Sequence, residues 1–115
     1  MAHDPKLLQP ILARAAPPNL DVAFRPMFGG IIAYADGKPF ASLSNIGLAL
    51  KFAGGERDAM LALPGTAPLR YEPDQPASKS YVVIPEPMLS EPDKLRSWVI
   101  RSVSSLPAKR VRKRG

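Results

Sequence analysis

The stretch IIAYADGKPFASL, residues 31–43, places the dipeptide Asp36-Gly37 between two segments rich in apolar residues. Asp-Gly tolerates the positive φ angles of a two-residue type I′ turn, whose twist matches that of paired antiparallel strands. The stretch therefore predicts a β-hairpin with strands at residues 31–35 and 38–43.

The segments beside this hairpin extend the predicted sheet. Residues 48–52 favour a third strand of the meander. Residues 22–28 also favour an extended conformation, but Pro26 cannot donate a ladder hydrogen bond, which indicates an edge or bulged strand. Gly29 and Gly30 then allow the chain to turn toward the hairpin.

Helices are predicted at both ends of the folded region and once in its middle. The first begins with Asp4 as its N-cap and ends before Pro17. A short helix is expected at residues 56–63, where a helical apolar pattern precedes a Pro-Gly pair. Ser90 and Asp93 resemble a capping box at the start of the last helix, on which Trp98 is expected to anchor the core.

Two further strands are predicted at residues 69–71 and 80–84. The resulting order, α-β-β-β-α-β-β-α, favours an α+β fold of two layers, in which helices cover an antiparallel sheet, over a parallel βαβ arrangement. We expect one domain at residues 1–107 and a basic, disordered tail at residues 108–115.

The composition is that of a globular domain. The chain has 115 residues, 45% hydrophobic and 23% charged, which is enough for one core and leaves no room for a second domain. The absence of cysteine excludes a disulfide framework, thiolate catalysis and cysteine-ligated metal sites. No apolar run approaches the roughly 20 residues that span a bilayer, and the N-terminal residues lack the pattern of a signal peptide. We therefore expect a cytoplasmic protein without a membrane span.

The sequence offers little for catalysis. His3 is the single histidine and lies at the terminus, and the common nucleophile and phosphate-loop motifs are missing. Most carboxylates have structural explanations, such as Asp36 in the turn and Glu56 with Asp58 at the favourable end of a short helix. We predict no catalytic residues, no metal site and no cofactor. A small enzyme that uses carboxylate or lysine chemistry is the least favoured alternative.

Residues 25–30 form the most distinctive local string and the first candidate site for a partner. They combine a cation, two large apolar side chains and two glycines; the members are Arg25, Pro26, Met27, Phe28, Gly29 and Gly30. A binding groove could begin at this point. The alternative is that Met27 and Phe28 pack in the core while the glycines accommodate a bulge.

Three strand residues are further candidates for partner binding. Lys51 alternates with Leu50 and Phe52, so it is expected on the opposite, solvent-facing side of its strand. Tyr34 and Tyr81 could line a ligand pocket. The alternative is that these aromatics contribute packing area while their hydroxyls reach water.

The C-terminal tail carries five of the six net positive charges, so the rest of the chain is nearly neutral. Its cations are Lys109, Arg110, Arg112, Lys113 and Arg114. They are candidates for phosphate contacts with DNA or RNA, and such contacts are largely sequence-independent. The alternative is a solubilising end with only nonspecific attraction to polyanions.

Several motifs occur in a characteristic order along the chain. They are Met27-Phe28-Gly29-Gly30, the hairpin Tyr-x-Asp-Gly-Lys-x-Phe at residues 34–40, LALK at 48–51, Pro64-Gly65, SYVVIP at 80–85 and LRSWV at 95–99. Together they resemble the N-terminal domain of the TfoX/Sxy family over about residues 4–106. The resemblance implies a compact α+β domain similar to secretion-chaperone folds, and a family whose best-known members regulate natural competence by promoting transcription. It implies no established catalytic residue or cofactor.

One departure from the longer regulators bears on function. They carry a second, helical C-terminal domain, whereas this sequence has a basic extension after its last predicted helix. We therefore expect a regulatory or protein-interaction module that binds a partner protein, and a homodimer is compatible with related folds. A nucleic-acid-associated protein that uses the basic tail is the alternative.

Overall fold

The Asp36-Gly37 turn is formed as predicted. The computed structural model describes residues 4–27, 30–70, 78 and 80–106, with the side chain of Met27 excepted. Asp36 has φ of 50° and Gly37 has φ of 85°, as a two-residue turn of the I′ type requires. The turn joins β2 (Gly30–Ala35) to β3 (Lys38–Ser44), and Ala35 pairs with Lys38 across it.

All neighbouring strands of the sheet are antiparallel, in the order β1-β2-β3-β4-β6-β5. The remaining strands are β1 (Val22–Met27), β4 (Gly47–Lys51), β5 (Ala67–Pro68) and β6 (Tyr81–Val83). The expected order of helices and strands is confirmed. The first group of strands has four members, because residues 22–27, for which an extended conformation was predicted, pair with β2 as the strand β1. The fold is the predicted α+β class.

Pro26 lies on an edge strand, as its missing donor indicated. The Asp36 amide donates to the Asp21 carbonyl at 2.9 Å, and hydrogen-bonded pairs alternate along an antiparallel ladder. The pair Pro26–Ile31 is therefore not hydrogen-bonded, and the backbone nitrogen of Pro26 points away from β2. The missing N–H of proline thus costs no hydrogen bond between the strands.

The strand predicted at residues 69–71 is displaced toward the N-terminus. β5 covers only Ala67–Pro68. The Leu69 amide still donates to the Tyr81 carbonyl at 3.0 Å, but the Leu69 carbonyl accepts from Ser78 at 2.7 Å. The Leu69 carbonyl therefore bonds Ser78 instead of continuing the ladder with β6, and Tyr71 lies outside the described residues.

The helices are α1 (Pro5–Ala15), α2 (Gly55–Leu61), the 3-10 helix η1 (Glu86–Ser90) and α3 (Pro92–Ser105). The Asp4 side chain accepts from the Lys6 amide at 2.9 Å, which confirms the predicted N-cap. The capping box predicted at Ser90 is wrong, because Ser90 belongs to η1 and Glu91 occupies the N-cap of α3.

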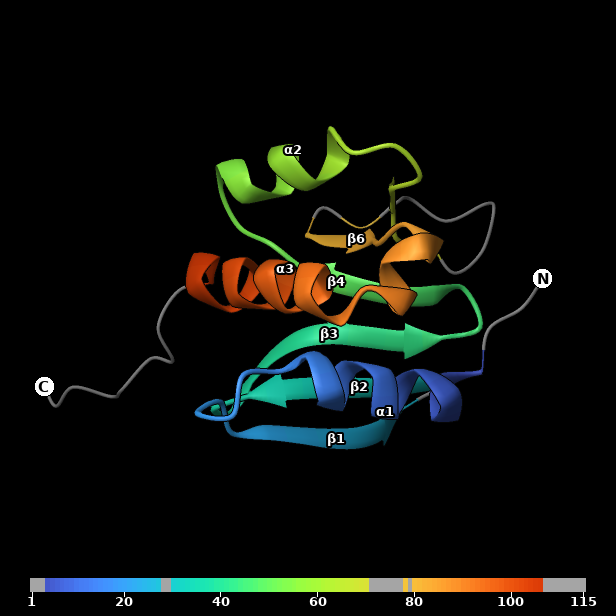
Figure 1. Ribbon diagram of the computed structural model, residues 1–115, viewed down its shortest axis with the longest axis vertical. Helices are drawn as coiled ribbons and strands as arrows, with labels where there is room; N and C mark the ends of the chain where they lie inside the picture. Colours follow the sequence, from blue (N-terminus) through green and yellow to red (C-terminus); the bar gives the residue numbers. More distant parts are fainter. Residues whose placement is uncertain (1–3, 28–29, 71–77, 79, 107–115) are drawn as a thin grey trace, which may run out of the picture.

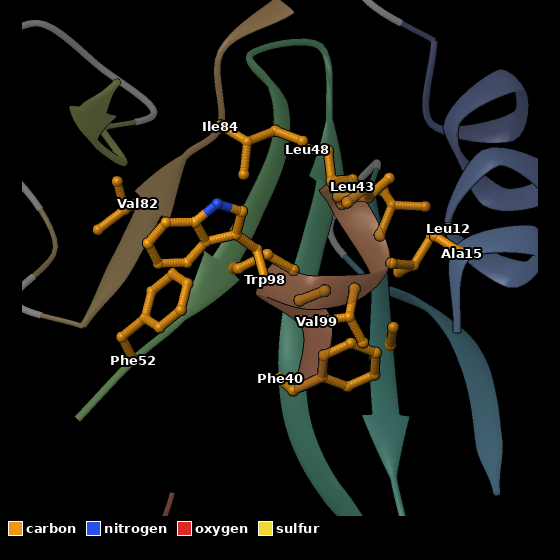
Figure 2. Packing of buried hydrophobic residues seen from close by; sticks show 14 of the residues in the cluster. Leu12, Ala15, Phe40, Leu43, Leu48, Phe52, Val82, Ile84, Trp98 and Val99 are labelled. Carbon is orange, nitrogen blue, oxygen red and sulfur yellow. The ribbon is translucent and has the colours of Figure 1, made fainter. Parts of the chain in front are cut away.

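Helices α1 and α3 run alongside the strands and cover one face of the sheet (Figure 1). Buried side chains from both helices and from the central strands form a single core. Trp98 is buried against Phe52, with the ring centroids 5.9 Å apart in an edge-to-face geometry (Figure 2). The predicted core role of Trp98 is therefore confirmed.

A β-bulge in β3 brings Phe40 into this core. Ala33 pairs with Ala41 and Tyr34 pairs with Pro39, so Phe40 is the additional residue between them. Phe40 is completely buried, and its ring lies close to Val99 of α3 (Figure 2).

Side chains of α3 hold the two layers together. The Arg96 guanidinium donates to the carbonyls of Ala15 at 3.0 Å and Arg14 at 3.1 Å, which lack helical partners at the end of α1. The Ser102 hydroxyl donates to the Lys51 carbonyl, and the Ser105 hydroxyl accepts from the Ala53 amide at 3.0 Å. One helix thus binds both the end of α1 and the end of β4.

Gly30 has a structural reason to be glycine. A Cβ atom at this position would lie 2.7 Å from the Leu43 carbonyl oxygen, which is backbone and cannot easily move. We expect Gly30→Ala to lower the free energy of unfolding by about 1–3 kcal/mol, as overpacking does. Urea denaturation followed by circular dichroism measures this change.

The matched control for this substitution is Gly55→Ala. A Cβ at Gly55 meets no atom within 4 Å, and alanine favours the helical conformation. The free energy of unfolding of this variant should stay unchanged or rise by up to about 1 kcal/mol. Equal destabilisation of both variants would contradict the steric explanation.

Candidate functional site

No described helix packs on the second face of the sheet. Strand alternation places on that face the residues whose side chains point away from the core. We call this surface the helix-free face; it comprises Ala23, Arg25, Ile32, Tyr34, Ser42, Ser44, Ala49, Lys51, Tyr81 and Val83. Four of the predicted partner-binding residues belong to it, namely Arg25, Tyr34, Lys51 and Tyr81.

Arg25 and Tyr34 form the first of two cation–π pairs on the helix-free face. The register pairs Arg25 with Ile32, so Tyr34 is its diagonal neighbour on β2. The guanidinium carbon lies 5.8 Å from the centroid of the tyrosine ring, within the range in which a cation is attracted to the ring face. The pair places an exposed positive charge over β1 and β2.

Lys51 and Tyr81 form the second pair, across β4 and β6. The two residues are direct partners in the register, and the Lys51 Nζ lies 5.8 Å from the ring centroid. The predicted side of the strand for Lys51 is confirmed, although the residue is half-buried. Because the Lys51 carbonyl accepts from Ser102 of α3, the backbone that carries this cation is tied to the helical layer.

Small residues lie between the two pairs. One row of paired residues crosses the sheet from β2 to β6, and it consists of Ile32, Ser42, Ala49 and Val83. Ala49 is 0% exposed and Ser42 is 2% exposed, whereas Ile32 and Val83 are half-buried. The small residues at the centre of this row are therefore buried, and the larger ones on either side are partly exposed.

The helix-free face is basic. None of the six strands contains an aspartate or a glutamate. Two of the described carboxylates outside the strands have other partners: the Glu56 carboxylate bonds Arg101, with its Oε1 2.8 Å from Nε and 2.7 Å from Nη2, and the Asp4 carboxylate caps α1. Both cations of the face thus lack a carboxylate neighbour on the strands themselves.

The Arg101 side chain belongs to a separate structural cluster. Its guanidinium lies 4.0 Å from the centroid of the Trp98 ring while it pairs with Glu56 of α2. This arrangement ties α2 to α3. It gives Glu56 a structural partner.

The other predicted site residues have different positions. Gly30 pairs with Met27 at the end of the β1–β2 ladder, where its lack of a side chain serves the close approach of β3. The Met27 side chain, Phe28, Gly29 and the tail cations Lys109, Arg110, Arg112, Lys113 and Arg114 lie outside the described residues. Their roles in binding stay predictions.

Sequence reasoning missed Ile32, Ser42, Ala49 and Val83 as members of the surface. Strand alternation alone could have placed Ile32 beside Tyr34 and Ala49 beside Lys51 on one side of the sheet. The row that joins all four depends on the register between β4 and β6, which residues 52–80 separate in the sequence.

Two surface grooves lie in the helical layer. One of about 250 Å³ is lined by Pro10, Ile11, Arg14, Leu89, Ser90 and Pro92, and one of about 230 Å³ by Pro17, Asn19, Leu20, Ile100, Val103 and Ser104. Neither lining set contains a carboxylate. In the part of the chain that the structure describes, no three histidine or acidic residues gather where they could hold a metal ion, and no helix is long and apolar enough to cross a membrane.

Comparison with known proteins identifies one family. Residues 16–106 match the model of the TfoX N-terminal domain. The match begins after α1, later than the start near residue 4 that the sequence motifs indicated. No curated protein and no solved structure shows a significant match, so the expected similarity to secretion-chaperone folds stays a prediction.

The Arg25–Tyr34 pair should contribute measurably to stability. Arg25→Ala, Tyr34→Leu and the double variant form a double-mutant cycle, for which we expect a coupling of about 0.5–1 kcal/mol in favour of the native pair. Urea denaturation of the four proteins gives this coupling.

The control cycle combines Arg25→Ala with Tyr81→Leu. These residues lie on β1 and β6, which are separated by three other strands, so their effects should add within about 0.3 kcal/mol. Equal coupling in both cycles would show that the cation–π contact is not its source.

Proposed function

This chain belongs to the TfoX N-terminal domain family, and from that premise we propose that it is a regulatory module that binds a protein partner through the helix-free face. The best-known relatives promote transcription of competence genes, and we extend the regulatory role, without the identity of the genes, to this chain. The observation that carries the proposal is the gathering of Arg25, Tyr34, Lys51 and Tyr81 on one face.

The chemistry of this face supports protein recognition. Tyrosine and arginine are enriched among the residues that dominate protein interfaces, because they combine large contact area with directional polar groups. The flanking Ile32 and Val83 add apolar area beside the two pairs. Tertiary contacts of α3 hold β4 in place, so little ordering is required when a partner binds.

We further propose that the chain is not an enzyme and that it acts in the cytoplasm. The first proposal is supported by the structural use of its described carboxylates, of which Asp36 forms the hairpin turn and Glu56 pairs with Arg101. A fold shared with other proteins does not by itself show that this chain has their activity.

Affinity capture from native lysate tests the docking surface. We expect the intact protein to recover a specific partner, and the double variant Tyr34→Ala/Tyr81→Ala to recover at least tenfold less, because hot-spot aromatics each contribute a large share of binding energy. Quantitative mass spectrometry of the captured proteins measures the ratio.

The control is Ile100→Ala, which shortens an exposed apolar side chain of α3 on the helical layer. It should recover the partner at the level of the intact protein. Circular dichroism must show that all variants are folded. Equal recovery by the double variant would reject the helix-free face as the docking surface.

The basic tail supports a second candidate function, the retention of DNA or RNA. Five cations occur between residues 109 and 114. This segment follows α3, whose Ser105 is hydrogen-bonded to Ala53, two residues after Lys51. The last turn of α3 therefore lies beside the end of β4.

Deletion of residues 108–115 tests this second function. If all five cations contact phosphates, a rise from 50 to 200 mM salt should weaken binding of the intact protein about 10²- to 10³-fold, and the deletion should remove that salt dependence. Fluorescence anisotropy with labelled duplex DNA and single-stranded RNA measures both. Unchanged affinity and salt slope after deletion would exclude the tail as the source of binding.

A further inference from the structure

We propose that two copies of this chain pair edge to edge through β1, in antiparallel orientation, so that their two sheets become one continuous sheet. The inference goes beyond the proposed function, because it concerns the edge of the sheet and not its helix-free face. Three observations carry it: the outward backbone groups of β1, the position of its proline, and two opposite charges on the same segment.

Strand β1 is an accessible edge. It is the first strand in the order of the sheet, and among the described strands it pairs with β2 alone. Figure 1 shows it at the lower border of the sheet, with no described element beyond it. The main contacts of α1 are with β2, β3 and β4, away from this border. Ala23, Arg25 and Pro26 are exposed, in contrast to the buried residues at the centre of the sheet.

Alternate backbone groups of β1 point outward. The Asp36 amide donates to the Asp21 carbonyl, so the odd-numbered residues of this segment direct their backbone groups toward β2. The N–H and C=O groups of Val22 and Phe24 therefore point to the accessible side. Pro26 has the same orientation but has no N–H. An edge with such unpaired groups can accept a further strand.

The proline selects one register for this pairing. When Val22 lies opposite Phe24 of the second copy, the two-fold symmetry also places Phe24 opposite Val22, and every outward N–H and C=O of both residues has a partner. Pro26 then lies opposite Leu20, whose amide already donates to the Pro17 carbonyl at 3.0 Å. The ladder between the copies thus ends where neither residue offers a donor.

The alternative register, with Phe24 opposite Phe24, fits less well. It places Val22 opposite Pro26 of the second copy, so the Val22 carbonyl faces a residue without an N–H. It also places Arg25 opposite Ala23, which offers no charge.

The favoured register brings opposite charges together. Strand alternation places Asp21 and Arg25 on the same side of the segment, and both are exposed. Within one chain they are four positions apart, about 13 Å along an extended strand, so they do not reach each other. Between copies, Arg25 lies directly opposite Asp21, and symmetry makes this contact twice. Opposite charges at directly facing positions stabilise a strand pair.

The apolar residues of β1 are also complementary. Val22 and Phe24 are half-buried and pack against the core from the side that faces the helices. In the favoured register each valine meets the phenylalanine of the second copy, and such pairs of β-branched and aromatic side chains stabilise a sheet. Ala23 meets its own copy at the two-fold axis, where a small side chain allows close approach.

The other edge of the sheet is a poorer site for pairing. Strand β5 contains only Ala67 and Pro68, so one of its two residues has no N–H. An extended peptide of another protein could use the backbone groups of β1, but a second copy supplies both the carboxylate opposite Arg25 and the apolar partners of β1 in one register. The self-complementary edge therefore favours a second copy as the occupant.

Complementary charge variants of the full chain test the dimer. Sedimentation equilibrium from about 1 µM to 1 mM should show reversible dimerisation of the intact protein. Asp21→Arg and Arg25→Asp should each weaken it at least tenfold, because like charges then face each other at both contacts. An equal mixture of the two variants should form a heterodimer about as tight as the intact dimer, because each contact again joins opposite charges.

Two controls accompany these variants. Asp58→Arg makes the same charge reversal at an exposed position of α2 and should change the dimer affinity less than twofold. Pro26→Ala should also change it less than twofold, because this position faces Leu20. In the alternative register the alanine N–H would reach the Val22 carbonyl and tighten the dimer severalfold. Circular dichroism establishes that each variant is folded.

Four outcomes would overturn the inference. They are a monomeric intact protein at every concentration, undiminished dimerisation of both charge variants, no association when the folded variants are mixed, and a tighter dimer after Pro26→Ala. Self-association that Tyr34→Ala/Tyr81→Ala abolishes and the charge variants retain would place the contact on the helix-free face and overturn it as well. Capture of a partner protein is a separate measurement, so either proposal can fail while the other stands.

Discussion

The two-residue turn at Asp36-Gly37 sets the register of β2 against β3, and the two faces of the sheet depend on that register. A slip by one residue would move every side chain of a strand to the other face. Leu43 would then leave the core, and the tyrosine of the first cation–π pair would enter it. The core and the helix-free face therefore depend on two local features, namely the turn, which requires positive φ at two consecutive residues, and the β-bulge at Phe40, which shifts the register by one residue.

The helical layer contributes to the helix-free face although it lies on the other side of the sheet. The Ser102 hydroxyl binds the carbonyl of Lys51, whose side chain points away from α3 toward Tyr81. Arg96 anchors the same helix to the carbonyl groups at the end of α1. Buried apolar contacts provide the non-directional part of the stability, and these hydrogen bonds fix where the layers meet. These bonds hold the end of β4 in place, and they thereby fix the backbone of Lys51, one of the two cations.

The charges of the chain have two separate locations with different physical properties. The tail collects five cations on a short segment and suits contacts with polyanions that are long-ranged and salt-dependent. The helix-free face instead holds single cations over aromatic rings, with apolar neighbours. Membership in the TfoX N-terminal domain family is consistent with a regulatory module in which these two regions address different partners.

The sequence by itself determined the elements whose signals are local. The Asp36-Gly37 turn, the Asp4 cap and the edge position of Pro26 were all predictable, because each follows from backbone chemistry within a few residues. Only the tertiary structure decided which distant residues become neighbours: the pairing of Lys51 with Tyr81, the bulge that turns Phe40 into the core, and the short β5 that ends where Leu69 meets Ser78. These features depend on register between strands far apart in the chain, where the free energy of packing the whole core outweighs local preference.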